Sequence, residues 1–203
     1  MKERTVVVVS AGLSQPSSTR LLADRLAAAV TSRAGALGVG VTIKTVELRD
    51  VAHDLMNHML TGFPPAALKT VLDDVAGADG LIAVTPVFNA SYSGLFKSFF
   101  DVLDKDALVD KPVLIAATGG TARHSLALEH ALRPMFAYLR AVTIPTSVFA
   151  ASEDWGGDED SLQGRVERAA GELARELSRR EPVTVADPFA LTASFEEMLA
   201  GGA

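Results

Sequence analysis

The feature that most restricts the fold of this chain is a set of short, almost continuous aliphatic runs. Residues 5–10 read TVVVVS, residues 80–85 read GLIAVT, and residues 112–118 read PVLIAAT. A strand with one face in water alternates apolar and polar residues, whereas a parallel strand covered by helices on both faces is apolar throughout. These runs therefore predict parallel strands in the middle of an α/β sheet.

Segments with helical spacing follow these runs along the chain. Apolar residues recur at i, i+3 and i+4 over residues 18–33, 65–76, 92–103, 124–140 and 159–180. Two further strands are expected at residues 41–48 and 143–149. Five βα units predict a three-layer, doubly wound α/β fold with a five-stranded parallel sheet in the order 2-1-3-4-5. We expect residues 1–203 to form one domain, with residues 181–203 as a tail containing a short helix around Phe195, Met198 and Leu199.

Composition excludes several classes of function. Lys and Arg number 19 against 25 Asp and Glu, giving a net charge of −6, so no basic field exists to attract nucleic acid or an anionic membrane. The absence of cysteine removes disulfides, thiolate nucleophiles and sulfur-based zinc sites, so any redox chemistry requires a cofactor. No apolar run approaches the roughly 20 residues of a membrane span, and no signal peptide is evident. We expect a cytoplasmic protein.

The loop after the first strand is rich in hydroxyl groups. It reads SAGLSQPSSTRLL and contains Gly12, Ser14, Ser17, Ser18 and Thr19. In a doubly wound fold, ligands bind at the carboxyl ends of the strands. Several hydroxyls at a helix N-terminus suit a phosphate monoester, but one of them would also serve as an ordinary helix cap. The spacing alone leaves both interpretations open.

Two later loops are also candidates for binding. The segment TPVFNASYSGLFKSFFD begins at Thr85; we expect Pro86 to end the third strand, and the next three residues to face a flat ligand. The backbone N–H groups of residues 89–91 are expected to precede the next helix. The fourth strand ends in ATGGTARHS, where Gly119 and Gly120 allow close approach to a ligand. A simple turn would have the same two glycines, and Phe88 would also suit a core.

Motifs of other functions are missing. The sequence has no GxxxxGK[ST] phosphate loop, no GxGxxG after the first strand and no GxSxG around Ser93. The histidine pairs are five and six residues apart, which does not place either pair on one helical face. We therefore predict no metal site.

Taken together, the three loops resemble the NADPH-dependent FMN reductases of the flavodoxin-like superfamily. The order and spacing match over about residues 5–180. Within that family, TPVFNASYSGLFKSFFD and ATGGTARHSLALEHALRP are most similar to the two-component reductases that supply reduced flavin to luciferase-like or alkanesulfonate monooxygenases.

The resemblance implies a flavodoxin-like fold, FMN and NADPH as redox partners, a homodimer or homotetramer, and a monooxygenase as recipient of reduced FMN. It implies that the first loop holds the FMN phosphate, the second lines one edge of the isoalloxazine and the third faces its pyrimidine end. The residues concerned are, in that order, Gly12, Ser14, Ser17, Ser18 and Thr19; Pro86, Val87, Phe88 and Asn89; and Thr118, Gly119, Gly120 and Thr121. No catalytic acid or base is implied, because hydride transfer requires mainly that the two rings are held together.

The sequence departs from the family at three places. Many relatives have an arginine where this chain has Ser14, and a Glu-Tyr pair where it has Val87 and Phe88. Some two-component relatives have a tyrosine where His130 stands. Without the guanidinium group, phosphate binding loses a charge-assisted contact, so we expect flavin to exchange easily.

Other functions remain open at this point. A quinone or azo-dye reductase would retain its flavin, and a flavodoxin-like carrier would need no nicotinamide site. A receiver domain would need acidic residues after the first strand, where Ser10, Ala11 and Gly12 stand. Trp155, the single tryptophan, suits either a wall of the nucleotide site or a subunit contact.

Overall fold

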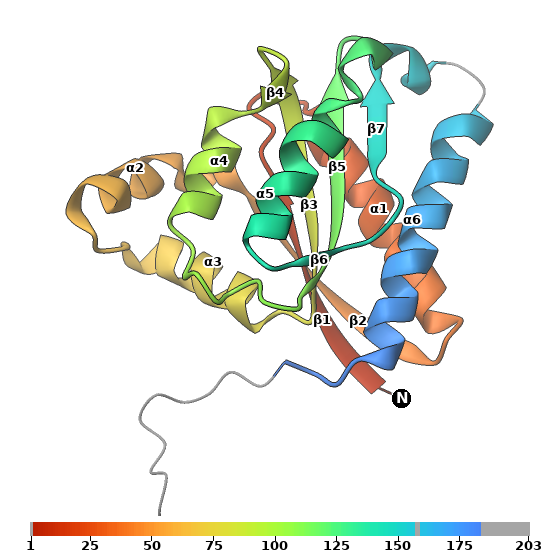
Figure 1. Cartoon of the computed structure of the whole chain (residues 1–203), viewed down its shortest axis with the longest axis horizontal. Helices are drawn as coiled ribbons and strands as arrows, with labels where there is room; N and C mark the ends of the chain where they lie inside the picture. Colours follow the sequence, from red (N-terminus) through yellow and green to blue (C-terminus); the bar gives the residue numbers. More distant parts are fainter. Residues whose placement is uncertain (1, 157–158, 184–203) are drawn as a thin grey trace, which may run out of the picture.

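A parallel β-sheet runs through the centre of the molecule and carries helices on both faces (Figure 1). The computed structural model describes residues 2–156 and 159–183. The strands lie in the order β2 (Val39–Glu47), β1 (Lys2–Ser10), β3 (Gly80–Phe88), β5 (Pro112–Gly119) and β6 (Val142–Thr143). The expected α/β fold with a parallel sheet is therefore present.

The number of strands differs from the prediction, because the described residues form seven strands in place of five. The expected strand over residues 143–149 is two strands, β6 and β7 (Val148–Ala151), which both pair with β5 in parallel. Pro145 lies between them and has no N–H to donate to a ladder. The other addition is β4 (Ser91–Tyr92), which pairs antiparallel with the end of β3.

Side chains from alternate strand positions form a hydrophobic core on each face of the sheet. Val6 and Val8 of β1 pack on the side of α1 (Ser18–Gly35) and α6 (Glu159–Arg179). Val7 and Val9 pack on the opposite side. That side is covered by α3 (Ala66–Gly77), α4 (Gly94–Asp101) and α5 (Arg133–Tyr138). Burial on both faces explains why these strands are apolar throughout.

Three helical segments differ from the expectation. The 3₁₀ turn η1 (Leu48–Val51) and helix α2 (Ala52–Thr61) follow β2, where no helix was predicted. The predicted helix over residues 124–140 is divided into the 3₁₀ turn η2 (Ala122–His124), the π-helical turn η3 (Leu128–Leu132) and α5. Pro134 in the first turn of α5 lacks the N–H that would continue the helical ladder from the preceding turn. The predicted C-terminal helix lies outside the described residues.

The strands of the parallel sheet end at one edge, to which the arrowheads of β5 and β7 point in Figure 1. The 3₁₀ turn η4 (Ser152–Trp155) follows β7 at this edge. No helix in residues 2–156 and 159–183 is long and apolar enough to span a bilayer.

Candidate functional site

A cavity of about 440 Å³ lies at the carboxyl ends of the central strands, within the size range of small-molecule sites. Ten of the residues predicted from the three loops line it, and Gly12, Asn89 and Thr121 do not. The wall also contains Leu13, Ser152 and Trp155. The full lining comprises Leu13, Ser14, Ser17, Ser18, Thr19, Pro86, Val87, Phe88, Thr118, Gly119, Gly120, Ser152 and Trp155.

The first loop brings hydroxyl and amide donors together at the N-terminus of α1. Ser17 is the N-cap, and its Oγ accepts a hydrogen bond of 3.2 Å from the backbone N–H of Arg20. The cap thus uses one hydroxyl and one of the amides that a helix N-terminus leaves unpaired. Ser14 and Ser18 are exposed at the cavity, and the positive end of the helix dipole points toward it. This arrangement provides neutral donors for an anion.

Two buried residues of this loop, Gly12 and Thr19, determine its shape. A Cβ atom at Gly12 would lie 2.0 Å from Ser17 Oγ, so no side chain fits there without displacing the cap. The hydroxyl of Thr19 forms a buried hydrogen bond of 2.8 Å with that of Thr118, which joins the start of α1 to the end of β5. Gly12 therefore acts through packing, and this is why it is absent from the cavity wall.

The positive charge nearest to this loop, that of Arg20, is already paired with carboxylates. Arg20 lies one residue after Thr19, but its guanidinium donates to Asp24 and Glu47 at 2.8 Å each. The hydrogen bond that Arg20 donates to Asp24, together with the charges of both carboxylates, raises the pKa of Arg20 above its ordinary value against the opposing effect of burial. An anion in the cavity therefore meets hydroxyls and backbone amides in place of a free guanidinium.

The second loop is a β-hairpin, which corrects two predictions. Pro86 does not end the third strand: β3 continues to Phe88 and pairs with β4 through Val87–Tyr92 and Phe88–Ser91. Asn89 and Ala90 form the turn with φ of 50° and 67°, the pattern of a two-residue type I′ hairpin. Asn89 is thus exposed at the hairpin tip, away from the cavity.

The hairpin leads into α4, which begins at Gly94 with Ser93 as its cap. Ser93 Oγ accepts from the N–H of Phe96 at 3.2 Å, and Ser93 N–H donates to Thr85 Oγ1 at 3.0 Å. The backbone N–H groups of residues 89–91 precede α4, as expected, and they belong to the hairpin. Phe88 is 46% exposed and lines the cavity, so it is not a core aromatic.

The two glycines after β5 have different roles. A Cβ atom at Gly119 would lie 2.8 Å from Cζ of the Phe149 ring, so packing requires a glycine there. Gly120 is exposed with open space around it, and it leaves the backbone accessible from the cavity. Thr121 does not line the cavity; it caps η2 by accepting from Arg123 N–H at 3.4 Å.

Sequence reasoning did not assign Leu13 and Ser152 to the site and left the role of Trp155 open. Ser152 and Trp155 belong to η4, which follows β7 and is brought to the same edge because Gly119 pairs with Ala151. The one sequence signal that could have placed this turn at the site was its position directly after a strand. Among the described residues, no group of three or more His, Asp or Glu side chains has the geometry to hold a metal ion.

Comparisons with known proteins agree on one group. The family model described as NADPH-dependent FMN reductase matches residues 4–156. The FMN reductase (NADPH) of Pseudomonas aeruginosa is 39% identical over 172 residues, which cover 83% of this chain and 90% of that protein. The NADH-dependent FMN reductase SfnE of Pseudomonas putida is 38% identical over 168 residues, covering 81% and 88%.

Solved structures give the same result. An oxidoreductase from Corynebacterium diphtheriae is 49% identical with a TM-score of 0.86, covering 89% of this chain and all of that one. The apo form of the NADH:FMN oxidoreductase EMOB is 31% identical with a TM-score of 0.77, covering 87% and 91%. An archaeal flavodoxin, 14% identical with a TM-score of 0.57, shares the fold alone. The chain belongs to the NADPH-dependent FMN reductase family, and its fold is flavodoxin-like.

Proposed function

We propose that this protein transfers hydride from a reduced nicotinamide nucleotide to FMN and that the cavity beside α1 is the flavin site. The observation that carries the proposal is the joining of three features in one cavity: a hydroxyl-rich helix N-terminus, the edge of a hairpin and an open Gly-Gly backbone. When both substrates are bound, the chemistry is hydride transfer from nicotinamide C4 to flavin N5, for which the protein needs mainly to align the rings.

The three walls suit the three parts of FMN. Ser14, Ser17, Ser18 and Thr19 with the first amides of α1 would bind the phosphate, as helix N-termini do. Pro86, Val87 and Phe88 would contact one edge of the ring. The backbone amides of Gly119 and Gly120 would donate to the pyrimidine end and stabilise the negative charge that develops there. Gly12, Asn89 and Thr121 would support these contacts from outside the cavity wall.

Arg123 is the residue we expect to bind the phosphates of the nicotinamide nucleotide. It is exposed on η2, three residues after Gly120, and no carboxylate within the described residues pairs with it. A free guanidinium is well suited to the 2′-phosphate that distinguishes NADPH from NADH.

Replacing Arg123 should therefore change the preference between the two nucleotides. For Arg123→Ala, we expect KM for NADPH to rise about tenfold while KM for NADH changes less than about threefold, as a lost charged hydrogen bond implies. Lys105→Ala, which removes an exposed lysine remote from the cavity lining, is the control. Equal changes in KM for the two nucleotides would show that Arg123 does not bind the 2′-phosphate.

We further propose that FMN is a substrate that leaves in the reduced form and is delivered to a monooxygenase. The neutral phosphate cradle supports this, because neutral hydrogen bonds contribute about half as much as charge-assisted ones. A homodimer or homotetramer is our proposal for the assembly.

Absorption spectroscopy followed by kinetics tests the proposal. The purified, dialysed protein should show little flavin absorption, oxidise NADPH in proportion to added FMN, and saturate in FMN. Under anaerobic conditions reduced FMN should pass through a filter that retains the protein. Stoichiometric retention of flavin in both redox states would instead identify a quinone or azo reductase, and no NAD(P)H oxidation with FMN would leave a flavodoxin-like carrier.

A further inference from the structure

Trp155 forms part of the cavity wall, although none of the three flavin-binding loops contains it. It ends η4, directly after β7, and is partly buried against the hydrophobic cluster shared by α1 and α6. Ser152, from the start of the same turn, also lines the cavity. A fourth segment of the chain therefore closes the site, and its one large side chain is an indole.

Arg25 holds the indole from the side of α1. Its guanidinium carbon lies 5.1 Å from the centroid of the Trp155 ring, within the range of a cation–π contact. Among the side chains of residues 2–156 and 162–183, no carboxylate forms an ion pair with Arg25, whereas Arg20 is bound to Asp24 and Glu47. The guanidinium of Arg25 packs on the indole ring.

Helix α1 connects the two ends of this arrangement. Its first turn carries the hydroxyl cradle, and Arg25 lies on the same helix less than two turns further along. The position of the indole is therefore fixed relative to the cradle by one rigid element.

We infer that Trp155 is a flavin-binding residue and that Arg25 is a positioning residue that fixes the orientation of the indole. The inference rests on the proposed function, since it concerns the same cavity. An indole supplies a flat apolar surface and one donor without adding charge, which suits a site that binds flavin through neutral groups. FMN in the cavity must then cover the exposed part of the ring.

Chemical footprinting tests whether FMN covers Trp155. The chain has a single tryptophan, so mild oxidation with N-bromosuccinimide followed by peptide mapping reports on this one indole. We expect saturating FMN to slow oxidation of the Trp155 peptide at least about fivefold. The oxidation rate of the peptide that contains Met56 and Met59, which are exposed on α2, should be unchanged and serves as the internal control.

Affinity measurements on variants test the contribution of each residue. With FMN binding followed by flavin fluorescence, Trp155→Ala should weaken binding about tenfold or more, and Trp155→Phe about two- to threefold because the apolar wall remains. Arg25→Met should weaken binding about two- to fivefold, as expected for a lost cation–π contact, and Arg25→Lys should restore most of the affinity. Tyr138→Ala, which removes an aromatic ring that is 86% exposed on α5, is the control.

Two results would overturn the inference. One is equal oxidation of Trp155 with and without bound FMN; the other is unchanged FMN affinity in Trp155→Ala with the fold intact by circular dichroism. Thermal unfolding of Arg25→Met shows directly whether the substitution lowers stability. Recovery of FMN affinity in Arg25→Lys, with unchanged thermal stability in Arg25→Met, identifies Arg25 as a positioning residue. If the wild-type protein does not bind FMN at all, the proposed function fails, whereas FMN binding without protection of Trp155 rejects this inference alone.

Discussion

At the scale of residues, the proposed flavin cradle depends on the charged groups that it lacks as much as on the donors that it contains. Ser17 combines two roles, since it caps α1 and lines the cavity. The neighbouring cation, Arg20, is committed to Asp24 and Glu47. The phosphate binding that we propose for this loop would depend on amides, hydroxyls and the helix dipole, and an added negative charge should weaken it strongly.

The substitution Ser17→Asp examines this dependence. Aspartate is a good N-cap, so the helix should remain intact, but its carboxylate would repel the FMN phosphate. We expect FMN affinity, measured by flavin fluorescence, to fall at least about tenfold. Ser17→Asn is the matched control, because it caps equally well without charge. Equal affinities for the two variants would contradict phosphate binding at this loop.

Lys111 is a buried cation remote from the cavity lining and gives a prediction about pH. Its Nζ donates to the carbonyls of Val75 and Ala76, at 2.5 and 2.8 Å, at the end of α3. Burial lowers the pKa of Lys111 from 10.5 to about 8, although the charge of Asp79 opposes the shift. Between these two values the unfolded chain binds more protons than the folded one, so this group makes stability rise with pH.

Urea unfolding of the wild type and Lys111→Met from pH 7.5 to 10 measures this effect. The difference in unfolding free energy should move in favour of the wild type by on the order of 2 kcal/mol over that range. Lys105→Met, at an exposed lysine, should follow the wild type at each pH. A constant difference between wild type and Lys111→Met would show that Lys111 titrates normally.

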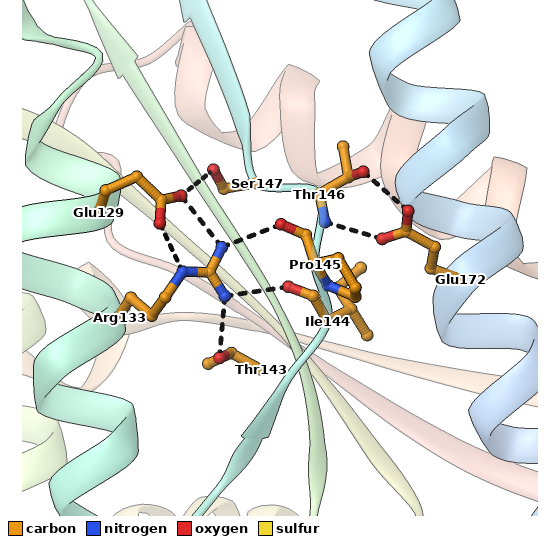
Figure 2. A network of polar contacts seen from close by, with 8 residues as sticks. All are labelled: Glu129, Arg133, Thr143, Ile144, Pro145, Thr146, Ser147 and Glu172. Atoms are coloured by element: carbon orange, nitrogen blue, oxygen red, sulfur yellow. Dashed lines mark hydrogen bonds and ion pairs between the residues drawn. The ribbon is translucent and has the colours of Figure 1, made fainter.

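At the scale of elements, the break between β6 and β7 shows where sequence patterns lose information. At this break, backbone groups have no partner strand, and side chains from two helices form hydrogen bonds with them instead (Figure 2). Arg133 donates to the carbonyls of Ile144 and Pro145 at 3.1 Å each, and Glu172 accepts from Thr146 N–H at 2.7 Å. Glu129 orients Arg133 through hydrogen bonds of 2.6 and 3.0 Å.

Removal of the Arg133 guanidinium should destabilise this element. In Arg133→Met the apolar stem remains, but two carbonyls and the Thr143 hydroxyl lose their donor. We expect a loss of about 1–3 kcal/mol in unfolding free energy by urea denaturation. Lys97→Met, which breaks an exposed ion pair with Asp101, should cost less than about 1 kcal/mol. Comparable losses would show that the network adds nothing beyond a surface pair.

The elements that could be predicted are those whose burial can be recognised from the residue types of the segment itself. β1, β3 and β5 were predicted because both of their faces are covered, which requires aliphatic residues at every position. Helix α2 was missed because it buries only Leu55 fully and leaves Met56 and Met59 exposed, so its pattern is weak. The hairpin was missed because Asn-Ala is not the usual type I′ pair and Pro86 suggested a strand end.

The part of the candidate site that could be predicted is the part formed by loops directly after the predicted strands. Residues in the three loops were found from hydroxyl, proline and glycine patterns, and the resemblance supplied their roles. Ser152 and Trp155 reach the cavity only because β7 pairs with β5 beside Gly119, a long-range contact that no local pattern encodes. The position of Gly12 outside the wall likewise depends on a packing distance, that to Ser17 Oγ.

At the scale of the whole molecule, the question is whether flavin stays or leaves. A helix N-terminus and neutral hydroxyls bind a phosphate, yet the loop from Ser10 to Thr19 contains no cation. The cavity therefore lacks the charge-assisted contact that would raise affinity at this end. The flavin exchange that we propose would follow from this one property of the first loop, and a single substitution should be able to reverse it.

Ser14→Arg is that substitution. Ser14 is exposed at the cavity, so an arginine there has room to reach a bound phosphate without displacing core residues. A new charged hydrogen bond contributes about 1.5–3 kcal/mol, which corresponds to roughly 10- to 150-fold tighter FMN binding. We expect the variant to co-elute with FMN on gel filtration and to turn over added FMN more slowly, since release becomes limiting. The gain should shrink at high salt and should be absent for riboflavin, which has no phosphate. Ser14→Gln, long but neutral, should exchange flavin like the wild type. If Ser14→Arg binds FMN no more tightly than Ser14→Gln, the phosphate does not lie at this loop and flavin exchange has another cause.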